Sequence, residues 1–464
     1  MKVCGREAAL SVVLSQPMHQ LTHASQLSYS PLPILERLSS YCELRREAMV
    51  AMASTRPKRP RNPAVLLLLA LLQLSLRASK INCATLHDNN TDALWLQAFR
   101  HGIKSDPSGW FSSWNSSANH CLWPGVRCSR KHPGRVVALQ LFGLNLTGRI
   151  GSSIGNLTFL RTLNLSTNGF SGRLPPLNHL QKLQVFDLSR NRLHDNIPYA
   201  IANCSSLREI DLSRNILVGK IPPKVALLSN LSLLRLSRNN LTGTIPPRLG
   251  NITSMRRLAL AYNKLTGSIP DELGKLTNIW YLALGGNRLS GGFPGCLFNL
   301  SNSLQYLSLE FNMLSKELPP NIGDDLPNLQ LLLLNDNIFE GQIPASLGNA
   351  RWLQILQLGN NNLTGTIGEW IGKLTRLQYL SLQANRFTKT LPSSLGQLTQ
   401  LDTLNLGNNK FEGPIPPALG NLQLLSYLDL SQNNLEGNIP IQLGSLTSLY
   451  KLDLSSNKLT GKFS

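Results

Sequence analysis

A repeated pattern occupies most of this 464-residue chain. From Val137 onward, the pattern L-x-L-x-x-N-x-L-x-G-x-I-P returns about every 24 residues. Its asparagine recurs at Asn168, Asn191, Asn215, Asn239, Asn263, Asn287, Asn312, Asn337, Asn361, Asn385, Asn409, Asn433 and Asn457. A unit this short cannot bury its own apolar face and must stack on its neighbours. The pattern therefore predicts a solenoid. In such a fold a longer chain adds further coils and does not enlarge a single core.

The coil around Asn263 shows how each unit would fold. Alternate side chains of a strand point to opposite faces, so Leu258 and Leu260 should face the interior. Arg257 and Ala259 should then face outward and line the concave side. Such a pattern is typical of leucine-rich repeats. We predict an α/β fold, a right-handed leucine-rich-repeat superhelix with a parallel β-sheet on its concave face and short helical turns on its convex face. It would hold about 14 repeats in residues 136–464, the last one incomplete.

The asparagine of each coil has a structural role in this prediction. Where the chain turns out of a strand, backbone groups lose their partners, and an inward amide can both donate to them and accept from them. Each such bond contributes about 1 kcal/mol net, whereas a buried group left unsatisfied costs about 1–3 kcal/mol. This explains an asparagine in every coil after the first, where Leu144 stands. Gly267 and its equivalents would permit a tight bend before the Ile-Pro step.

The N-terminal part of the chain lacks the repeat. Residues 1–63 are unpatterned, and we expect them to be disordered or mis-annotated. Because Met49 or Met52 would be a better start of translation, we expect residues 1–48 to be an artefact of gene prediction or a dispensable extension. An apolar run of 13 residues at 64–76 follows a basic segment. Because this run is too short to span a bilayer comfortably, residues 64–79 are predicted to be a signal peptide with its cleavage zone. The sequence contains no apolar run long enough to span a bilayer, which predicts no transmembrane segment in this chain.

The positive charge of the chain is not concentrated in the repeats. Residues 1–80 carry 11 Lys and Arg against 4 Glu, which is +7 of the formal net charge of +20. The other +13 spreads over some 380 residues without a basic tract in the repeats. We therefore expect no nucleic-acid partner.

Cysteines and glycosylation sequons are consistent with export. Cys121 and Cys128 stand just before the first repeat, where the exposed first coil must be covered, and we predict a disulfide between them. Cys204 is expected to be a buried thiol, too far from Cys296 to bridge it. Sequons that would carry glycans in a secreted chain are Asn145, Asn156, Asn164, Asn230, Asn240, Asn251, Asn299 and Asn362. About half of them also follow from the repeat pattern itself.

The segment ahead of the coils resembles a known cap. Asp92–Phe99, Asp106–Gly109, Ser113–Asn115 and Cys121–Cys128 are similar to the plant-type N-terminal cap of leucine-rich-repeat receptor-like kinases and receptor-like proteins. We place this cap at residues 88–132.

Repeat details extend the resemblance to residues 92–464. The L-[TS]-G-x-I-P element is similar to the plant-specific repeat. Two 25-residue coils, with L-F-N-L-S at Leu297–Ser301 and L-P-N-L-Q at Leu326–Gln330, resemble the subfamily that includes immune receptors for bacterial peptides. Members of the family continue into further repeats, a transmembrane helix and a kinase, whereas this chain stops at Ser464 inside its fourteenth coil. We therefore expect a fragment, a truncated gene product or a mis-split gene model.

The sequence gives no sign of an enzyme. Nucleotide-binding glycine motifs, a G-x-S-x-G elbow and a C-x-x-C pair are all absent, and the eight histidines show no metal-ligand spacing. Asp324-Asp325 and Asp271-Glu272 pair carboxylates, but at positions where helix starts favour acids. We predict no catalytic activity, no metal and no cofactor.

The outward positions of the central coils vary against the fixed repeat. The candidate ligand-binding residues of the concave face are Arg235, Arg238, Arg257, Tyr262, Trp280, Tyr281, Tyr306 and Phe311. Aromatic and arginine side chains are the types that dominate interface energies, and Arg235 with Arg238 could hold a carboxylate. Five coil steps of about 4.8 Å match roughly seven extended peptide residues. The alternative for the arginines is ordinary pairing with neighbouring acids such as Asp187, Asp211 and Glu209.

Three hypotheses for function follow. The first is the ectodomain of a plant receptor that binds a peptide or protein on its concave face, in defence or developmental signalling, outside the plasma membrane. The resemblance implies that a co-receptor kinase would be bridged by the ligand. The second is a secreted leucine-rich-repeat inhibitor of a pathogen's cell-wall-degrading enzyme, and the third is a nonfunctional fragment.

Overall fold

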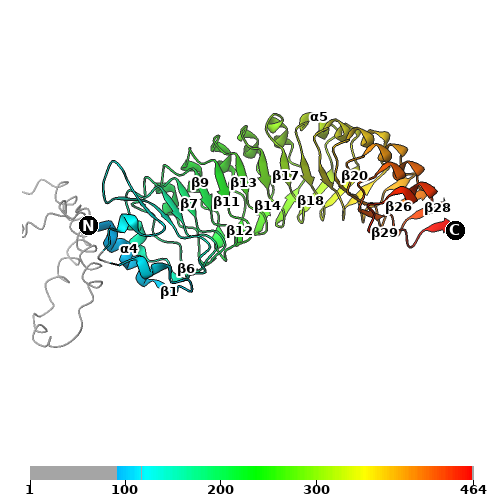
Figure 1. Ribbon diagram of the computed structural model, residues 1–464. Helices are drawn as coiled ribbons and strands as arrows, with labels where there is room; N and C mark the ends of the chain where they lie inside the picture. The colour runs from blue at the N-terminus through cyan, green and yellow to red at the C-terminus, as the bar shows by residue number, and fades with distance from the viewer. Residues whose placement is uncertain (1–90, 116–117, 462–464) are drawn as a thin grey trace, which may run out of the picture. The chain divides into compact units, whose positions relative to one another are not determined.

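The computed structural model describes residues 91–115 and 118–461 (Figure 1). The predicted N-terminal extension, residues 1–63, and the predicted signal peptide, residues 64–79, lie outside these ranges. Within the described residues, no helix combines the length and the apolar character needed to cross a bilayer.

A long parallel sheet runs through the described coils. It has 15 strands, each hydrogen-bonded to the strand of the next coil, and only its first pair, β2 with β3, is antiparallel. The strands are β2 Val126–Cys128, β3 Val136–Gln140, β5 Thr162–Asn164, β7 Val185–Asp187, β9 Glu209–Asp211, β11 Leu233–Arg235, β13 Arg257–Ala259, β15 Tyr281–Ala283, β17 Tyr306–Ser308, β19 Leu331–Leu333, β21 Ile355–Gln357, β23 Tyr379–Ser381, β25 Thr403–Asn405, β27 Tyr427–Asp429 and β29 Lys451–Asp453. The leucine-rich-repeat solenoid with a parallel sheet is confirmed.

Helical turns lie opposite this sheet, on the outer side of the bend (Figure 1). Most are 3-10 helices of five residues, and they confirm the short helical turns predicted for the convex face. The cap has turns of its own, η1 Trp110–Ser113 and η2 His120–Leu122, together with helix α4 Thr91–His101. In the coils, they are η3 Ser152–Asn156, η4 Tyr199–Asn203, η5 Pro223–Leu227, η6 Pro247–Asn251, η7 Asp271–Lys275, η8 Gly295–Leu300, α5 Ile322–Asp325, η9 Ala345–Asn349, η10 Glu369–Lys373, η11 Ser393–Gln397, η12 Pro417–Asn421 and η13 Ile441–Ser445.

Differences in coil length are taken up on the helical side. The 23-residue coil between Asn168 and Asn191 has no helix between β6 and β7. The two 25-residue coils instead contain a longer turn, η8, and the α-helix α5. The long sheet keeps its register through all of them, with Tyr281 opposite Tyr306.

Further parallel pairing follows the bend after each asparagine, and the sequence did not predict it. The cap strand β1 joins the edge of this pairing and is antiparallel to β4. These strands form sheets of four, seven and four strands among the described residues. They are β1 Ile103–Ser105, β4 Thr147–Arg149, β6 Gly169–Gly172 and β8 Arg192–Leu193; β10 Val218–Lys220, β12 Asn240–Gly243, β14 Lys264–Gly267, β16 Arg288–Gly291, β18 Met313–Glu317, β20 Ile338–Gln342 and β22 Asn362–Thr364; and β24 Thr388–Lys389, β26 Lys410–Gly413, β28 Asn434–Asn438 and β30 Lys458–Thr460. Gly267 has φ +81° there, the bend expected of it.

The asparagine ladder joins each coil to the preceding one. Asn263 Nδ2 donates to the Leu236 carbonyl of the preceding coil and to its own Leu260 carbonyl, both at 3.0 Å. Its Oδ1 accepts from the Leu241 N–H at 3.0 Å. Because all of these groups are buried, every coil depends on the amide of the next one to satisfy its turn. Leucines such as Leu258 and Leu260, both fully buried, fill the space between the faces.

Candidate functional site

The centre of the long sheet presents a column of large outward side chains. Arg257, Tyr281 and Tyr306 are direct neighbours on β13, β15 and β17. The rings of Tyr281 and Tyr306 stack with centroids 4.2 Å apart and planes at 19°. Burial raises the pKa of the Tyr306 hydroxyl above its ordinary value, and Tyr281 adds to this shift. The strand register therefore produces a fixed, half-exposed aromatic surface.

Trp280 extends this surface toward the start of the strands. Its ring meets the Tyr281 ring edge-on at 5.7 Å, and the Arg257 guanidinium lies 5.4 Å from its centroid. Trp280 is 36% exposed, so a large apolar area remains open to a ligand.

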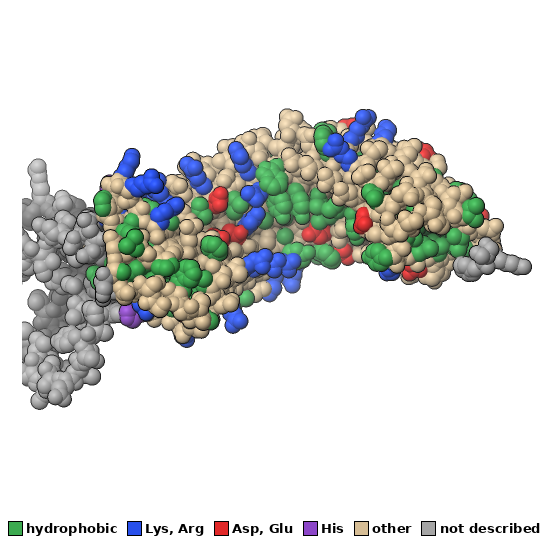
Figure 2. Space-filling model, in the orientation of Figure 1, with side chains coloured by type: hydrophobic (Ala, Val, Ile, Leu, Met, Phe, Trp, Pro, Cys, Tyr) green, Lys and Arg blue, Asp and Glu red, His purple; other side chains and the backbone are tan. Residues whose placement is uncertain are grey.

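Beside this column, small side chains leave a shallow depression next to the large rings. Ala259, Ala261 and Ala283 are buried and pack against Tyr281. A Cβ on Gly286 would lie 2.6 Å from the ring of Tyr262, so this ring lies directly on the glycine backbone. We call Tyr262, Trp280, Tyr281, Tyr306 and Phe311 the aromatic strip. Figure 2 shows hydrophobic side chains gathered over the middle of the visible face.

Three candidate residues lie at the turn that leaves the strand. Arg238, Tyr262 and Phe311 have φ of 59°, 56° and 52°. This left-handed conformation is rare for large side chains, and it recurs at the residue before the asparagine in most coils. The turn exposes all three side chains, with Tyr262 at 40% and Phe311 at 48%.

The two arginines predicted to hold a carboxylate already have partners within the chain. Arg235 Nη1 lies 3.4 Å from Asp211 Oδ2, and the Arg238 guanidinium lies 4.4 Å from the centroid of the Tyr262 ring. The two side chains thus point to different neighbours. A ligand carboxylate would have to compete with Asp211 for Arg235.

Sequence reasoning missed an acidic group beside the strip. Glu310 is only 7% exposed, and its Oε2 has no hydrogen-bond partner among the described residues. Burial raises the pKa of Glu310 above its ordinary value, and the Asp336 carboxylate adds to this. In the next coil, Asn335 Oδ1 is likewise buried and without a partner in the described part of the chain. The only sequence signal was an acid in a position where other coils mostly carry Ser, Ala, Gly or amides.

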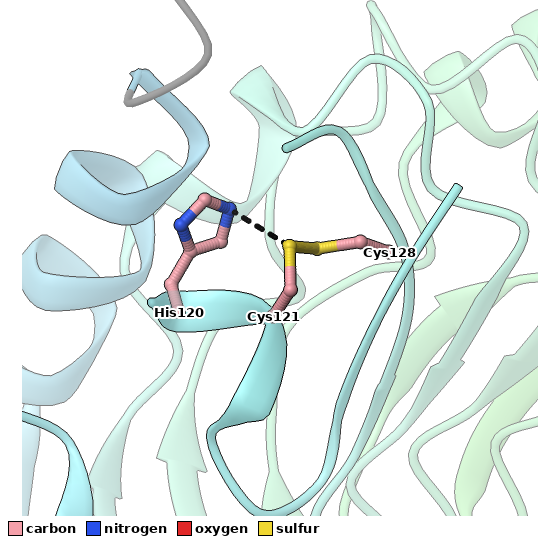
Figure 3. Close-up of side chains that lie close together, drawn as sticks. All are labelled: His120, Cys121 and Cys128. Carbon is pink, nitrogen blue, oxygen red and sulfur yellow. Dashed lines mark hydrogen bonds between the residues drawn. A yellow bond between two sulfur atoms is a disulfide. The ribbon is translucent and has the colours of Figure 1, made fainter. Parts of the chain in front are cut away.

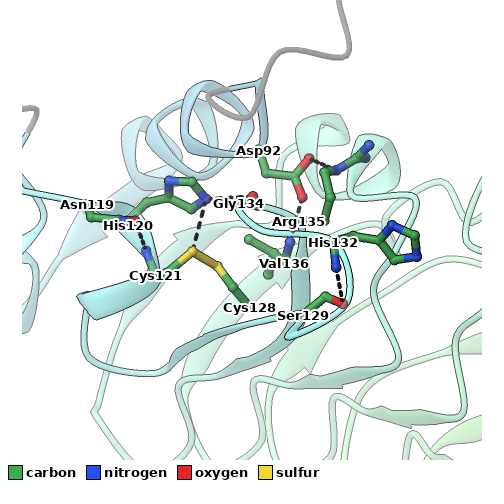
Figure 4. Close-up of a disulfide and its surroundings, with 10 residues drawn as sticks. All are labelled: Asp92, Asn119, His120, Cys121, Cys128, Ser129, His132, Gly134, Arg135 and Val136. Carbon is green, nitrogen blue, oxygen red and sulfur yellow. Dashed lines mark hydrogen bonds and ion pairs between the residues drawn. A yellow bond between two sulfur atoms is a disulfide. The ribbon is translucent and has the colours of Figure 1, made fainter.

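The cap contains a compact cluster around a disulfide. Cys121 and Cys128 are bonded to each other, and His120 Nε2 lies 3.6 Å from Cys121 Sγ (Figure 3). Disulfide sulfurs do not offer the thiolates that bind metal ions, so this cluster is structural. Because a carbonyl can only accept, His120 Nε2 donates to Gly134 O at 2.8 Å and ties down the following loop (Figure 4).

All eight asparagines predicted to carry glycans are at least partly exposed to solvent. Asn145, Asn230, Asn240, Asn251 and Asn299 are exposed. The intermediate ones are Asn156, Asn164 and Asn362.

Asn164 differs from the other sequons because its side chain is already engaged. Its Oδ1 accepts from the Ser166 N–H and hydroxyl at 3.0 and 2.7 Å. Asp187 makes the same pair of bonds with Ser189 one coil later. The asparagine therefore has a structural role in addition to the predicted glycan.

Family comparisons cover both the cap and the coils. A leucine-rich-repeat N-terminal domain matches residues 89–129. A leucine-rich-repeat region matches residues 338–462. Leucine-rich-repeat matches also cover residues 229–289, as well as 159–179, 182–204, 206–228 and 303–324. Together, these repeat matches cover more than half of the chain.

Individual proteins give the same result. The chain is 36% identical over 116 residues to phytosulfokine receptor 1 of Arabidopsis thaliana, a match that covers 25% of the chain and 11% of that receptor. The chain thus spans only a small part of its curated relatives.

Solved structures agree in fold. The plant peptide hormone receptor RGFR1 in complex with RGF2 aligns with TM-score 0.60 at 29% identity, covering 68% of this chain and 58% of that one. A TDR receptor aligns with TM-score 0.63 at 32% identity, covering 71% and 66%. The chain therefore belongs to the leucine-rich-repeat family, and its repeats are similar to those of plant receptor-like kinase ectodomains.

Proposed function

We propose that the solenoid is the recognition module of a plant receptor and binds an extended peptide, or a peptide-like segment of a protein, along the aromatic strip. The Tyr281 and Tyr306 stack carries this proposal. A rigid pair of half-exposed rings offers apolar contact area at little cost in side-chain entropy, which is characteristic of binding hot spots. The low surface over Ala259 and Ala283 beside the stack gives a ligand backbone room to approach.

Polar groups beside the strip suggest what the ligand carries. Glu310 Oε2 and Asn335 Oδ1 are acceptors without donors in the described residues. The two residues lie on adjacent coils. The N–H of Phe311, the residue after Glu310, donates to the Asn335 carbonyl at 3.0 Å. A ligand with an ammonium or guanidinium group at this point would supply the missing donors after a small rotation of the Glu310 side chain.

Support for a peptide ligand also comes from the comparisons. RGFR1, which is similar in fold, is described as a peptide hormone receptor in complex with RGF2. By analogy, the module would work noncatalytically outside the plasma membrane and present its bound ligand to a co-receptor kinase, in defence or developmental signalling. The disulfide and the accessible sequons are consistent with such a location.

A peptide library provides a test without a known ligand. Random peptides of about seven residues would be selected on the protein, and the affinities of enriched peptides measured for the double variant Tyr281→Ala with Tyr306→Ala. Because the variant removes both rings, we expect at least about a tenfold loss of affinity.

The matched control is Tyr379→Ala with Tyr427→Ala. These tyrosines occupy the same outward column farther along the sheet, on β23 and β27. Affinity should be retained in this control. Equal binding by the wild type and the Tyr281/Tyr306 variant would rule out the aromatic strip as the binding site.

A further inference from the structure

Charge is distributed unevenly between the cap and the first coils. Between Asp106 and Asp187 the chain contains no Asp or Glu. The same stretch carries eight basic residues: Arg127, Arg130, Lys131, Arg135, Arg149, Arg161, Arg173 and Lys182. Figure 2 shows Lys and Arg side chains recurring along the N-terminal half of the visible face.

Several of these cations surround one cavity. The cavity has a volume of about 530 Å³ and lies where the cap meets the first coils. Its basic lining residues are Arg127, Arg130, Lys131, Arg161 and Lys182, together with His132. We call it the basic pocket. None of these six side chains has an acidic partner among the described residues, since the ion pairs found there involve other groups.

An aromatic ring positions part of the lining. Lys182 Nζ lies 3.5 Å from the centroid of the Phe159 ring, and the ring of His132 meets it edge-on at 4.9 Å. Arg135 also lies against this ring, at 4.4 Å, and is neutralised by Asp92 with Nε 3.2 Å from Oδ1. Cation-π contact thus holds the Lys182 ammonium beside the cavity without removing its charge.

The loop that supplies Arg130, Lys131 and His132 is firmly closed. The Ser129 N–H donates to the Arg135 carbonyl at 2.8 Å, and the His132 N–H donates to Ser129 Oγ at 3.1 Å. The disulfide at Cys128 fixes one end of the loop (Figure 4). At the other end, the Val136 N–H donates to Asp92 Oδ2 at 2.7 Å. The cationic side chains therefore project from a preorganised frame.

We propose that the basic pocket binds a compact anion that carries several phosphate, sulfate or carboxylate groups. The three arginine and two lysine side chains around this cavity repel each other, and a multivalent anion would relieve this repulsion while accepting charge-assisted hydrogen bonds. The pocket is too large for one small ion and suits a molecule with two or three anionic groups. This site is separate from the aromatic strip and does not depend on the function proposed for it.

Calorimetric titration of the whole protein with inorganic tripolyphosphate and, separately, with citrate would test the site. We expect saturable binding of at least one of them that weakens as salt is added. Tighter binding of tripolyphosphate would assign a phosphorylated ligand, and tighter binding of citrate a polycarboxylate.

The variant Arg161→Gln with Lys182→Gln should bind the preferred anion at least about tenfold more weakly, because two charge-assisted contacts are lost. Both side chains are exposed, so the fold should persist, which an unchanged thermal midpoint would verify. The control, Arg149→Gln with Arg173→Gln, removes the same charge from the same acid-free stretch but outside the pocket. Absence of saturable binding for both anions, or an equal loss in the control, would overturn the proposal.

Discussion

The carboxylate of Glu310 occupies the space above Gly285 on the neighbouring coil, where an added Cβ would lie 2.4 Å from Oε1. A residue larger than glycine at position 285 would displace the Glu310 carboxylate. Glycine here therefore allows Glu310 to lie flat on the sheet, at the cost of leaving Oε2 buried without a partner in the described residues.

Replacing Glu310 by glutamine should stabilise the protein at neutral pH. Because burial raises the pKa of Glu310 in the folded state, the folded protein holds this proton more tightly than the unfolded chain. The stabilising contribution of the protonated acid is complete below the ordinary pKa and is lost as pH rises through the folded value. Glu310→Gln should gain on the order of 1 kcal/mol at pH 7 and little at pH 4, as measured by thermal unfolding. Glu340→Gln, at an exposed position, is the control, and an equal gain at both pH values would contradict the prediction.

Removal of one ladder amide should be costly. Asn263→Ala leaves the Leu241 N–H and the Leu236 and Leu260 carbonyls without this partner. Each such buried group costs about 1–3 kcal/mol, so the unfolding midpoint should fall markedly. Asn240→Ala, at an exposed position nearby, should change it little. If both variants unfold at the same temperature, the ladder does not hold the coils together.

The two unpaired cysteines of the described residues should react slowly in the native state. Burial raises the pKa of Cys204 to about 12 and, mainly for the same reason, that of Cys296 to about 11. Almost no thiolate therefore exists at pH 8. Iodoacetamide labelling located by peptide mass spectrometry should find Cys204 modified only after unfolding, with Cys296 the faster of the two. Rapid native labelling of Cys204 would disprove its burial.

Loss of the cap disulfide should affect both stability and the basic pocket. The double variant Cys121→Ser with Cys128→Ser opens a short loop. We expect its free energy of unfolding to fall by about 2–3 kcal/mol. It also frees one end of the segment that carries Arg130 and Lys131, so tripolyphosphate or citrate should bind more weakly in titration even well below the unfolding temperature. Cys204→Ser, which leaves the cap intact, should bind as the wild type does.

Much of the fold was predictable because the repeat imposes it. The position of Asn263 in its coil determined which neighbours face inward, and the stacked coils place Arg257, Tyr281 and Tyr306 in one column as the spacing suggested. The pairing of β12 with β14 was not predictable, because Thr-Gly-x-Ile-Pro lacks the alternation that marks a half-buried strand.

Other parts of the candidate sites depend on contacts that no local pattern encodes. Large residues such as Phe311 disfavour the left-handed turn that they occupy here. The burial of Glu310 depends on a glycine 25 residues away in the sequence. The basic pocket brings a cap loop together with Phe159 and Lys182 from later coils. Because the contacting residues lie far apart in the sequence, these features could not be predicted from the pattern of a single repeat.

Coil length varies only on the outer, helical side, while Tyr281 stays opposite Tyr306 in a 25-residue coil. Insertion of one residue can therefore be absorbed by a longer turn without rotating any side chain of the inner face. Duplication of a whole coil, in contrast, would lengthen that face by one step of about 4.8 Å. The length of the inner face can therefore change only by whole coils, whereas the outer face tolerates changes of a single residue.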